Sequence, residues 1–378
     1  MATTTLGRLP RFRTIGHAEK TNLMRAMRSD LSGYLGGVVK GGYWCERLAE
    51  EWQAAFKVKY AVPCNSATSG LLAACMAAGI NKDSVVWTTA MSMSATAACA
   101  KVLGAHVVFI DIETMRFSMN MNNFRGTPPK AIIVANLFGH PAYLSSMRSW
   151  CDSNNVIMIE DNAQSPFAME NGRYAGTIGH MGVFSLNVHK HIQCGEGGVV
   201  VTSDDNFRLR LLNAINHGEL SGDVNPITGL NLRMVEPVAA IACAQLAKGP
   251  KIVEGRRELA AEITDMFSHV QWIQTPVEDV GCKHVYYMWA ARVYHGYRSK
   301  LVAELTSHGF PVREGYSKPL NLIFPSMQGH DYGIGPQPCP VAERMEDEEI
   351  MCFEICAYDP MAYQIRKMRE IVKRAIAA

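Results

Sequence analysis

The sequence predicts an α/β protein, in which a large domain with a mostly parallel central sheet flanked by helices is followed by a smaller C-terminal α+β domain. The first observation is that short apolar segments alternate with helix-like segments between residues 68 and 216. The second is that these apolar segments are rich in Val, Ile and Phe without polar alternation, as in strands covered on both faces. The third is the length of 378 residues, which suggests two domains.

The expected elements of the large domain follow one another along the chain. The strands are Val85–Thr89, His106–Asp111, Ala131–Phe138, Val156–Asp161, Gly182–Leu186 and Val199–Ser203. The helices are Thr68–Ala78, Ser94–Leu103, Ala142–Asn154 and Asp205–Asn216. In open α/β sheets the ligand lies beyond the carboxyl ends of the strands, so residues just after each strand are the candidate site residues.

The pattern changes around Gly249-Pro250. Helical periodicity on both sides of this pair gives way to a β-rich stretch, then to a loop rich in Pro and Gly, then to a closing helix. We therefore expect an N-terminal arm and large domain over residues 1–250 and a small domain over residues 251–378. The elements near and after the boundary are Met234–Ala247, Lys251–Ser268, His284–Val293, Ile323–Pro340 and Ala362–Ala377.

Charge and composition exclude several classes of protein. The 37 basic and 35 acidic residues give a net charge of +2 without a basic cluster, which argues against a nucleic-acid binder. The eleven cysteines stand singly in apolar stretches, so neither disulfides nor a zinc site is expected. The chain start has no apolar signal segment, and no run of about 18 apolar residues is present. A cytoplasmic protein with no membrane span is expected.

Three polar segments hold the residues that could carry chemistry. NSATSG (65–70) offers hydroxyls and free N–H groups to an anion at a helix start. IEDNAQ (159–164) places carboxylates at the end of a strand, and NVHKHIQCGEGG (187–198) places a lysine beside a glycine-permitted turn. Each segment alone is weak evidence for a functional site, since an N-cap, a loop aspartate and a surface lysine are common. Neither a Walker loop nor a G-x-G-x-x-G following an N-terminal strand is present. An anion cradle, an aspartate and a lysine in this order are, however, the parts that a pyridoxal phosphate enzyme requires.

When further short segments are considered together with these three, the chain resembles the DegT/DnrJ/EryC1/StrS family. This family comprises the sugar aminotransferases of the fold-type I pyridoxal phosphate superfamily. The resemblance runs from about Gly33 to Pro340 and rests on NSATSGL, SATAACAKVLGAHVVFIDI, LFGHPA, IEDNAQ, FSLNVHKHIQCGEGGVVVT, NHG and GLNLRMVEPVAA. It implies a fold-type I transferase that binds pyridoxal 5'-phosphate. It also implies amino transfer from glutamate to a nucleotide-linked keto-deoxy-sugar through a Schiff base on Lys190.

The resemblance assigns roles to individual residues. Lys190 and Asp161 match the catalytic lysine and the aspartate that keeps the pyridine nitrogen protonated. Asn231 matches an asparagine that reaches the neighbouring subunit's cofactor phosphate, which implies a homodimer with shared active sites. The segment VREGYSKPL (312–320) lies near the active-site mouth of relatives and gives the substrate-binding candidates Arg313, Tyr316 and Lys318. The cofactor-binding positions are Thr68, Ser69, Met93, Asp161, Gln164, Ser185, Lys190 and Asn231.

Two departures from the family pattern and four alternative functions stay open. Met93 stands where relatives stack an aromatic ring on the cofactor, and Asn136 stands where relatives often have a histidine. The protein could act on a keto-cyclitol or form an aminobenzoate-type ring. It could also dehydrate a sugar, although dehydratase relatives have histidine at the position of Lys190. An alternative of another class is a binding or regulatory protein that has the family fold but a decayed site. Met93 is the only residue that points to this alternative.

Overall fold

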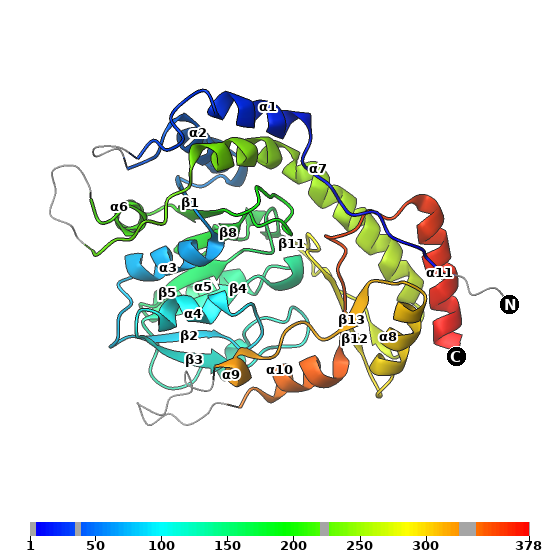
Figure 1. Ribbon diagram of the computed structural model, residues 1–378. Helices are drawn as coiled ribbons and strands as arrows, with labels where there is room; N and C mark the ends of the chain where they lie inside the picture. Colours follow the sequence, from blue (N-terminus) through cyan, green and yellow to red (C-terminus); the bar gives the residue numbers. More distant parts are fainter. Residues whose placement is uncertain (1–4, 35–38, 220–226, 325–337, 378) are drawn as a thin grey trace.

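The computed structural model describes residues 5–34, 39–219, 227–324 and 338–377, and a sheet of seven strands dominates it (Figure 1). The strand order is β1-β9-β8-β5-β4-β2-β3. The pairings of β2 with β3 and β4, of β4 with β5 and of β5 with β8 are parallel, whereas β9 is antiparallel to β1 and β8. The expectation of a mostly parallel sheet is confirmed. The strands are β1 (Tyr60–Cys64), β2 (Val85–Thr89), β3 (His106–Ile110), β4 (Ala131–Ala135), β5 (Ile157–Asp161), β8 (Met181–Ser185) and β9 (Gly198–Thr202).

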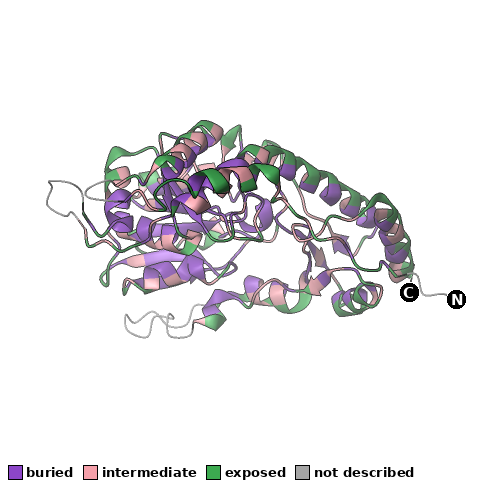
Figure 2. Ribbon diagram, turned by 45° about the horizontal axis from the view of Figure 1, so that its top comes forward, coloured by how far each residue is buried: buried purple, intermediate pink, exposed green. Residues whose placement is uncertain are grey.

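Helices cover both faces of this sheet. Helices α3, α4 and α6 pack on one face, and α2, α5 and the first half of α7 pack on the other. Adjacent strand residues alternate between the two cores, since Val86 belongs to the first and Trp87 to the second. Figure 2 shows the buried strands enclosed by helices whose outer faces are exposed. The helices are α1 (His17–Ala26), α2 (Tyr43–Phe56), α3 (Ala67–Ala77), α4 (Ala95–Lys101), α5 (Leu144–Ser153) and α6 (Asp205–Ile215).

Helix α7 (Glu236–Phe267) runs without interruption through the region where we expect the domain boundary. Pro250 lies inside it, although proline removes one helical hydrogen bond. The first half of α7 packs in the core of the large sheet, and Leu259, Ile263 and Phe267 of the second half belong to a separate core. We keep the division into residues 1–250, the large part, and 251–378, the C-terminal part, as a proposal that these two cores support.

The C-terminal part is built on a four-stranded antiparallel sheet in the order β10-β12-β14-β13. Helices α8 (Arg298–Ser307) and α11 (Ala362–Ala377) cover it together with the second half of α7. A three-stranded sheet, β11-β6-β7, pairs a strand of this part with two of the large part. The expected Pro- and Gly-rich loop lies mostly outside the described residues. The remaining strands are β6 (Met169–Glu170), β7 (Arg173–Tyr174), β10 (Ile273–Gln274), β11 (Cys282–Lys283), β12 (Trp289–Val293), β13 (Val312–Glu314) and β14 (Ile350–Phe353).

Five short helical turns complete the secondary structure of the described residues. Two of them, α10 and the π-helical turn that follows it, precede β14, and one 3-10 turn follows β4 directly. The turns are the 3-10 segments Met121–Asn123 and Leu137–Gly139, the helices α9 (Leu320–Ile323) and α10 (Pro340–Arg344), and the π-helical Met345–Glu349.

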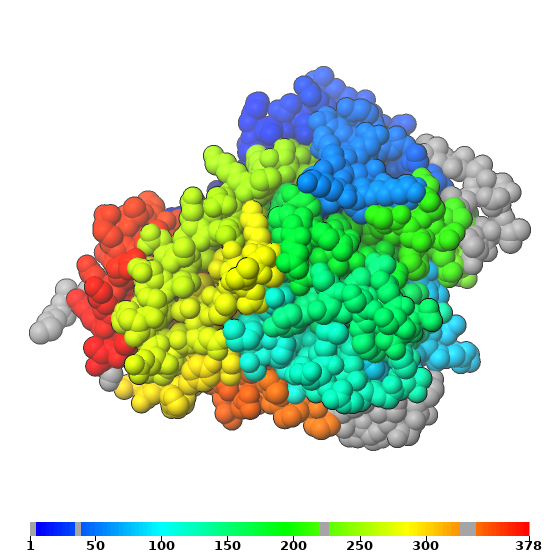
Figure 3. All heavy atoms as spheres, turned by 180° about the vertical axis from the view of Figure 1, so that it is seen from behind, coloured from blue at the N-terminus to red at the C-terminus, as the bar shows by residue number. Residues whose placement is uncertain are grey.

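The N-terminal arm packs on the C-terminal part through residues 6–12, and its Thr14 accepts hydrogen bonds from Gln193 and Gln245 of the large part. Leu6 belongs to the core of the C-terminal part and its N–H donates to the carbonyl of His308 (2.9 Å), while Arg11 forms a β-bridge with Tyr358. Figure 3 shows the opposite face, with α7 (yellow-green) stretching from the blue N-terminal helices to α11 (red). The described helices include none with the length and apolarity needed to cross a bilayer.

Candidate active site

Residues at the carboxyl ends of five strands of the large sheet line one pocket of about 410 Å³. This is the position where ligands bind in open α/β sheets. The C-terminal part closes the pocket with two tyrosines, Tyr287 and Tyr316. The lining residues that follow the strands include Ser66, Thr68, Ser92, Met93, Asn136, Asp161, Gln164, Ser185 and Lys190.

Lys190 lies in the hairpin between β8 and β9. The backbone N–H of Lys190 donates to the carbonyl of Asn187 (2.9 Å), and Val188 donates to Gly195 (2.9 Å). Gly195 has a φ of +91°, so the turn needs a glycine there, as the sequence indicated. Burial lowers the pKa of the Lys190 amine, and the negative charge of Asp161 opposes that shift. An amine that loses its proton more easily is more often in the neutral form, and only that form can act as a nucleophile or accept a proton.

Asp161 ends β5 and is 7% exposed. Its Oδ2 accepts a hydrogen bond from the hydroxyl of Thr96 (2.6 Å), and its Oδ1 accepts one from the N–H of Ala163 (3.2 Å). Burial raises the pKa of Asp161, while the Thr96 hydrogen bond favours the charged form. In the described part of the chain no salt bridge joins Asp161 to a cation. Within the described residues the site therefore presents a buried carboxylate that forms no salt bridge and interacts with the amine of Lys190 only at longer range.

Gln164 connects the two parts of the chain across the pocket. Its Oε1 accepts a hydrogen bond from the N–H of Phe138 (2.8 Å), and its Nε2 donates to the hydroxyl of Tyr316 (2.8 Å). The N–H of Tyr316 donates in turn to Glu346 (2.7 Å), and burial raises the pKa of Tyr316 to about 12. The Tyr316 hydroxyl is thus protonated at neutral pH and held at one position.

The amino end of α3 forms the floor of the pocket beside β8 and β9. Ser66 caps the helix by accepting a hydrogen bond from the N–H of Ser69 (3.1 Å). Among the described residues no acceptor is found for the N–H groups of Ala67 and Thr68, which leaves them available to an anion. Gly198 permits the close approach of helix and sheet, because a Cβ there would lie 2.6 Å from the carbonyl carbon of Ser66.

The structure brings together most, but not all, of the site residues expected from the sequence. The N–H and the hydroxyl of Ser69 both form hydrogen bonds with the Ser66 hydroxyl in the helix cap. Asn231 is exposed and forms a β-bridge with Asn216 outside the pocket. Arg313 donates to the Tyr316 carbonyl (2.8 Å) and pairs with Glu354, and Lys318 is exposed. The expected residues that do line the pocket are Thr68, Met93, Asp161, Gln164, Ser185, Lys190 and Tyr316.

The two departures from the family pattern differ in their surroundings. Met93 is 56% exposed and lies on the pocket wall, where it can contact a bound ring. Asn136 is buried, and its Nδ2 donates to Glu160 (3.1 Å) and to Asn162 (2.9 Å). Glu160 also accepts three backbone N–H groups from residues 176, 178 and 179. Asn136 therefore braces the loops behind the pocket.

Sequence reasoning missed two residues of this site. Thr96 lies in α4 and binds Asp161 from the neighbouring strand connection. Tyr287 comes from the C-terminal part, and the centroid of its ring lies 4.2 Å from Nζ of Lys190. Neither residue lies at the end of an expected strand, so only the tertiary structure places them here.

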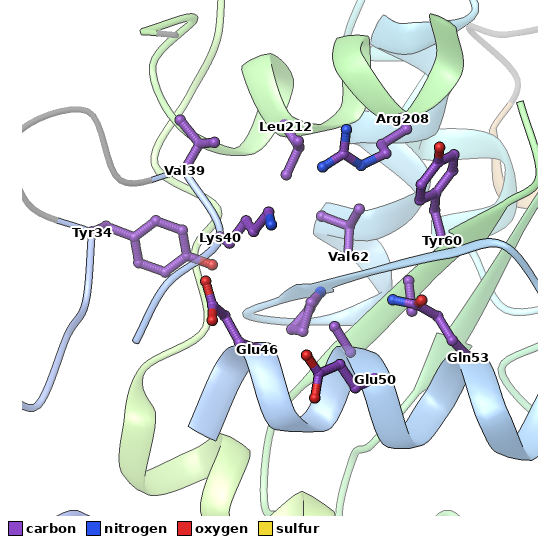
Figure 4. Close-up of a pocket in the computed structure, with 13 residues that line it drawn as sticks. Tyr34, Val39, Lys40, Glu46, Glu50, Gln53, Tyr60, Val62, Arg208 and Leu212 are labelled. Atoms are coloured by element: carbon purple, nitrogen blue, oxygen red, sulfur yellow. The ribbon is translucent and has the colours of Figure 1, made fainter. Parts of the chain in front are cut away.

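A second hollow, of about 240 Å³, lies beside the outer edge of β1, away from these strand ends (Figure 4). Arg208 and Lys40 face the carboxylates of Glu46 and Glu50 across it. Lys40, Glu46 and Glu50 are exposed, so this hollow is an open, solvated surface. It holds none of the residues that the family resemblance singles out.

Comparison with known proteins identifies the family. The model of the DegT/DnrJ/EryC1/StrS aminotransferase family matches residues 26–355. The dTDP-3-amino-3,4,6-trideoxy-alpha-D-glucose transaminase of Micromonospora megalomicea subsp. nigra is 27% identical over 346 residues, which cover 88% of this chain and 90% of that protein. The GDP-4-keto-6-deoxy-D-mannose 3-dehydratase of Yersinia pseudotuberculosis is 30% identical over 211 residues, or 50% and 54% of the two chains.

A solved structure agrees in fold. The aminotransferase from Psychrobacter cryohalolentis superimposes with a TM-score of 0.89 at 22% identity, covering 98% of this chain and 99% of that one. The family match spans the large sheet, the pocket and most of the C-terminal part. The chain therefore belongs to the DegT/DnrJ/EryC1/StrS aminotransferase family and is a transaminase that depends on pyridoxal phosphate.

Proposed function

We propose that this protein transfers an amino group from glutamate to a keto-deoxy-sugar carried on a nucleotide, and that it does so as a homodimer with shared active sites. One observation carries the proposal: the half-buried Lys190 and the buried Asp161 face one pocket at the carboxyl ends of the strands. The M. megalomicea relative, which its name describes as a transaminase of a dTDP-linked amino sugar, supports the substrate class.

The pocket fits pyridoxal phosphate. Asp161 is a buried carboxylate that a protonated pyridine nitrogen would pair with. The free N–H groups at the start of α3, with the hydroxyls of Thr68 and Ser185, form a cradle for the phosphate. When bound, the cofactor supplies an electron sink for breaking the bond between the donor's α-carbon and its hydrogen.

Lys190 has two tasks in this proposal. Its amine would hold the cofactor when it is bound, and the free amine of Lys190 would accept the proton that leaves the donor's α-carbon. Both tasks need a neutral amine, and the burial that lowers the pKa of Lys190 favours that form. Gln164, held by Phe138 and Tyr316, is placed to orient the cofactor ring.

The remaining expected residues act at the mouth or across the dimer. We propose that Tyr316 and the exposed Lys318 contact the nucleotide sugar, and that Arg313 supports Tyr316 through its carbonyl. Asn231 is exposed and outside the pocket of its own chain, which suits a residue that reaches the partner subunit's phosphate site.

Comparison of Lys190→Ala with the surface variant Lys20→Ala tests the proposal. The visible absorbance before and after glutamate and the formation of 2-oxoglutarate with a panel of nucleotide keto-sugars are the readouts. We expect Lys190→Ala to abolish the absorbance change that glutamate causes and the formation of 2-oxoglutarate. Lys20→Ala should leave both as in the wild type. Full turnover by Lys190→Ala would show that the mechanism is wrong, and amino transfer to a cyclitol but to no sugar would favour the alternative substrate.

Sugar dehydration is the second candidate reaction, because the Y. pseudotuberculosis relative is named as a dehydratase. The residue of this chain at the decisive position is Lys190, where the resemblance gives dehydratases a histidine. A product with the mass of the amino sugar supports transamination, and a product that has lost water without gaining nitrogen supports dehydration.

A further inference from the structure

An aromatic ring of the C-terminal part lies on the amine of Lys190. The centroid of the Tyr287 ring is 4.2 Å from Nζ, well inside the range over which a ring face attracts a cation. Tyr287 is 9% exposed and lines the same pocket, so water screens this contact little. The ring therefore stabilises the charged form of an amine whose burial favours the neutral form.

Backbone hydrogen bonds from the large part fix the segment that carries this ring. The N–H of Val285 donates to the carbonyl of Gly139 (2.8 Å), and the N–H of Met288 donates to that of Phe138 (3.2 Å). Gly139 has a φ of +104°, and a Cβ at this position would lie 2.5 Å from the N atom of Tyr286. The turn after β4 thus holds the Tyr287 segment tightly against the carboxyl edge of the sheet.

Few other groups act on the charge of Lys190. Asp161 on β5 favours the ammonium. Cys356, which follows β14, would do so only as a thiolate, and burial raises the pKa of its thiol to about 11. His191, next in sequence, is buried, and burial lowers its pKa to about 3, so it is neutral. In the proposed function Asp161 pairs with the cofactor's ring nitrogen, which leaves its charge less available to Lys190. The Tyr287 ring then becomes a main partner of the ammonium.

We propose that Tyr287 is a positioning residue for Lys190, whose ring holds the amine against the pocket wall whenever the amine carries its extra proton. This inference rests on the proposed function, because it takes Lys190 to be the cofactor lysine. A lysine that takes up a proton from the donor must keep it close to the place where it is returned. A ring face offers the ammonium such a place, because it attracts the cation and does not itself accept the proton.

The test measures the reactivity of Lys190 in the full-length chain after the cofactor has been removed with hydroxylamine. Reductive methylation with formaldehyde modifies neutral amines, and peptide mass spectrometry reports each lysine separately as a function of pH. Wild type, Tyr287→Phe and Tyr287→Leu are compared, and Lys59 on the surface serves as the reference amine in the same samples. Thermal unfolding of each variant shows whether it is folded.

The quantity compared is the pH at which labelling of Lys190 is half-maximal. We expect Tyr287→Phe to keep the wild-type value and Tyr287→Leu to lower it by about 0.4 to 1.5 pH units, because only the Leu variant removes the ring. A folded Tyr287→Leu with an unchanged Lys190 midpoint would overturn the proposal, and so would an equal shift in Tyr287→Phe. If the Leu variant fails to fold, Tyr287→Met is measured by the same criteria. The labelling needs no turnover, so absence of transamination would count against the proposed function and leave this result standing.

Discussion

The side chain of Gln164 donates a hydrogen bond to the hydroxyl of Tyr316, with 2.8 Å between Nε2 and the oxygen. This bond joins the carboxyl end of β5 to the C-terminal part directly over the pocket that also contains Lys190. The same glutamine accepts from the N–H of Phe138, so it is held on two sides. Tyr316 thereby couples the position of Gln164 to the packing of the C-terminal part.

Removing the Tyr316 hydroxyl should disturb the site more than it disturbs the fold. In Tyr316→Phe the amide of Gln164 loses its acceptor, and we expect a loss of about 0.5–1.5 kcal/mol in the free energy of unfolding, as for an ordinary hydrogen bond. We also expect a higher KM for the keto-sugar, since Tyr316 lines the mouth. Urea denaturation and steady-state kinetics measure the two effects. Tyr363→Phe, at an exposed residue of α11, is the matched control.

The charge of Asp161 should dominate cofactor binding. In Asp161→Asn the proposed pair with the pyridine nitrogen is lost, and breaking a buried charge pair costs about 3–5 kcal/mol. The cofactor dissociation constant should therefore rise by roughly 100- to 5000-fold, as measured by the absorbance of the protein titrated with pyridoxal phosphate. Asp152→Asn, on the surface beside Arg148, should leave it unchanged. Equal affinities in the two variants would contradict the role assigned to Asp161.

Thr96 should set the acid limit of cofactor binding. Burial raises the pKa of Asp161, and the Thr96 hydrogen bond opposes that rise by favouring the carboxylate. The charged form exists above this pKa and is lost as the pH falls through it. Thr96→Val should therefore move the loss of binding to a higher pH by about 1 to 2 units, since a hydrogen bond to a charged group contributes about 1.5–3 kcal/mol. Titrations of cofactor binding across pH 4 to about 8 check this sign.

The sequence predicts the large part well because local rules apply there. The apolar strands of a parallel sheet are recognisable, and their carboxyl ends share one edge, so Asp161 and Lys190 meet without knowledge of the loops. The expected strand 131–138 extends too far, because Phe138 adopts a φ of +57° and the ladder ends at Ala135. Such a conformation depends on the bond to Gln164, which no local pattern reveals.

The C-terminal part is less predictable because long-range contacts decide its conformation. The expected β-rich stretch His284–Val293 forms a strand only from Trp289, since Val285 and Met288 bond to the turn after β4 instead. Pro250 does not end α7, because separate cores anchor the helix on both sides of it. Tyr287 and Thr96 escaped notice for the same reason, since each reaches the pocket through contacts distant in sequence.

Met93 should contribute modestly to cofactor affinity. A thioether packed on a ring contributes about 0.3–1.5 kcal/mol, so Met93→Ala should weaken binding by roughly 2- to 12-fold. Met93→Phe should bind at least as tightly as wild type, because an aromatic ring stacks on the cofactor with similar or greater strength. The titration with pyridoxal phosphate measures both, with Met24→Ala in the exposed face of α1 as control. A loss beyond a hundredfold would indicate a structural role for Met93.

Asn231 provides the sharpest test of shared active sites. If each site takes Lys190 from one chain and Asn231 from the other, Lys190→Ala and Asn231→Ala each impair both sites of a homodimer. Unfolding and refolding the two variants together gives mixed dimers in which one of the two sites has neither substitution. Random pairing places half of the dimers in this class, so activity should recover to about a quarter of the wild-type value. If the mixture is no more active than its components, each active site takes Lys190 and Asn231 from the same chain.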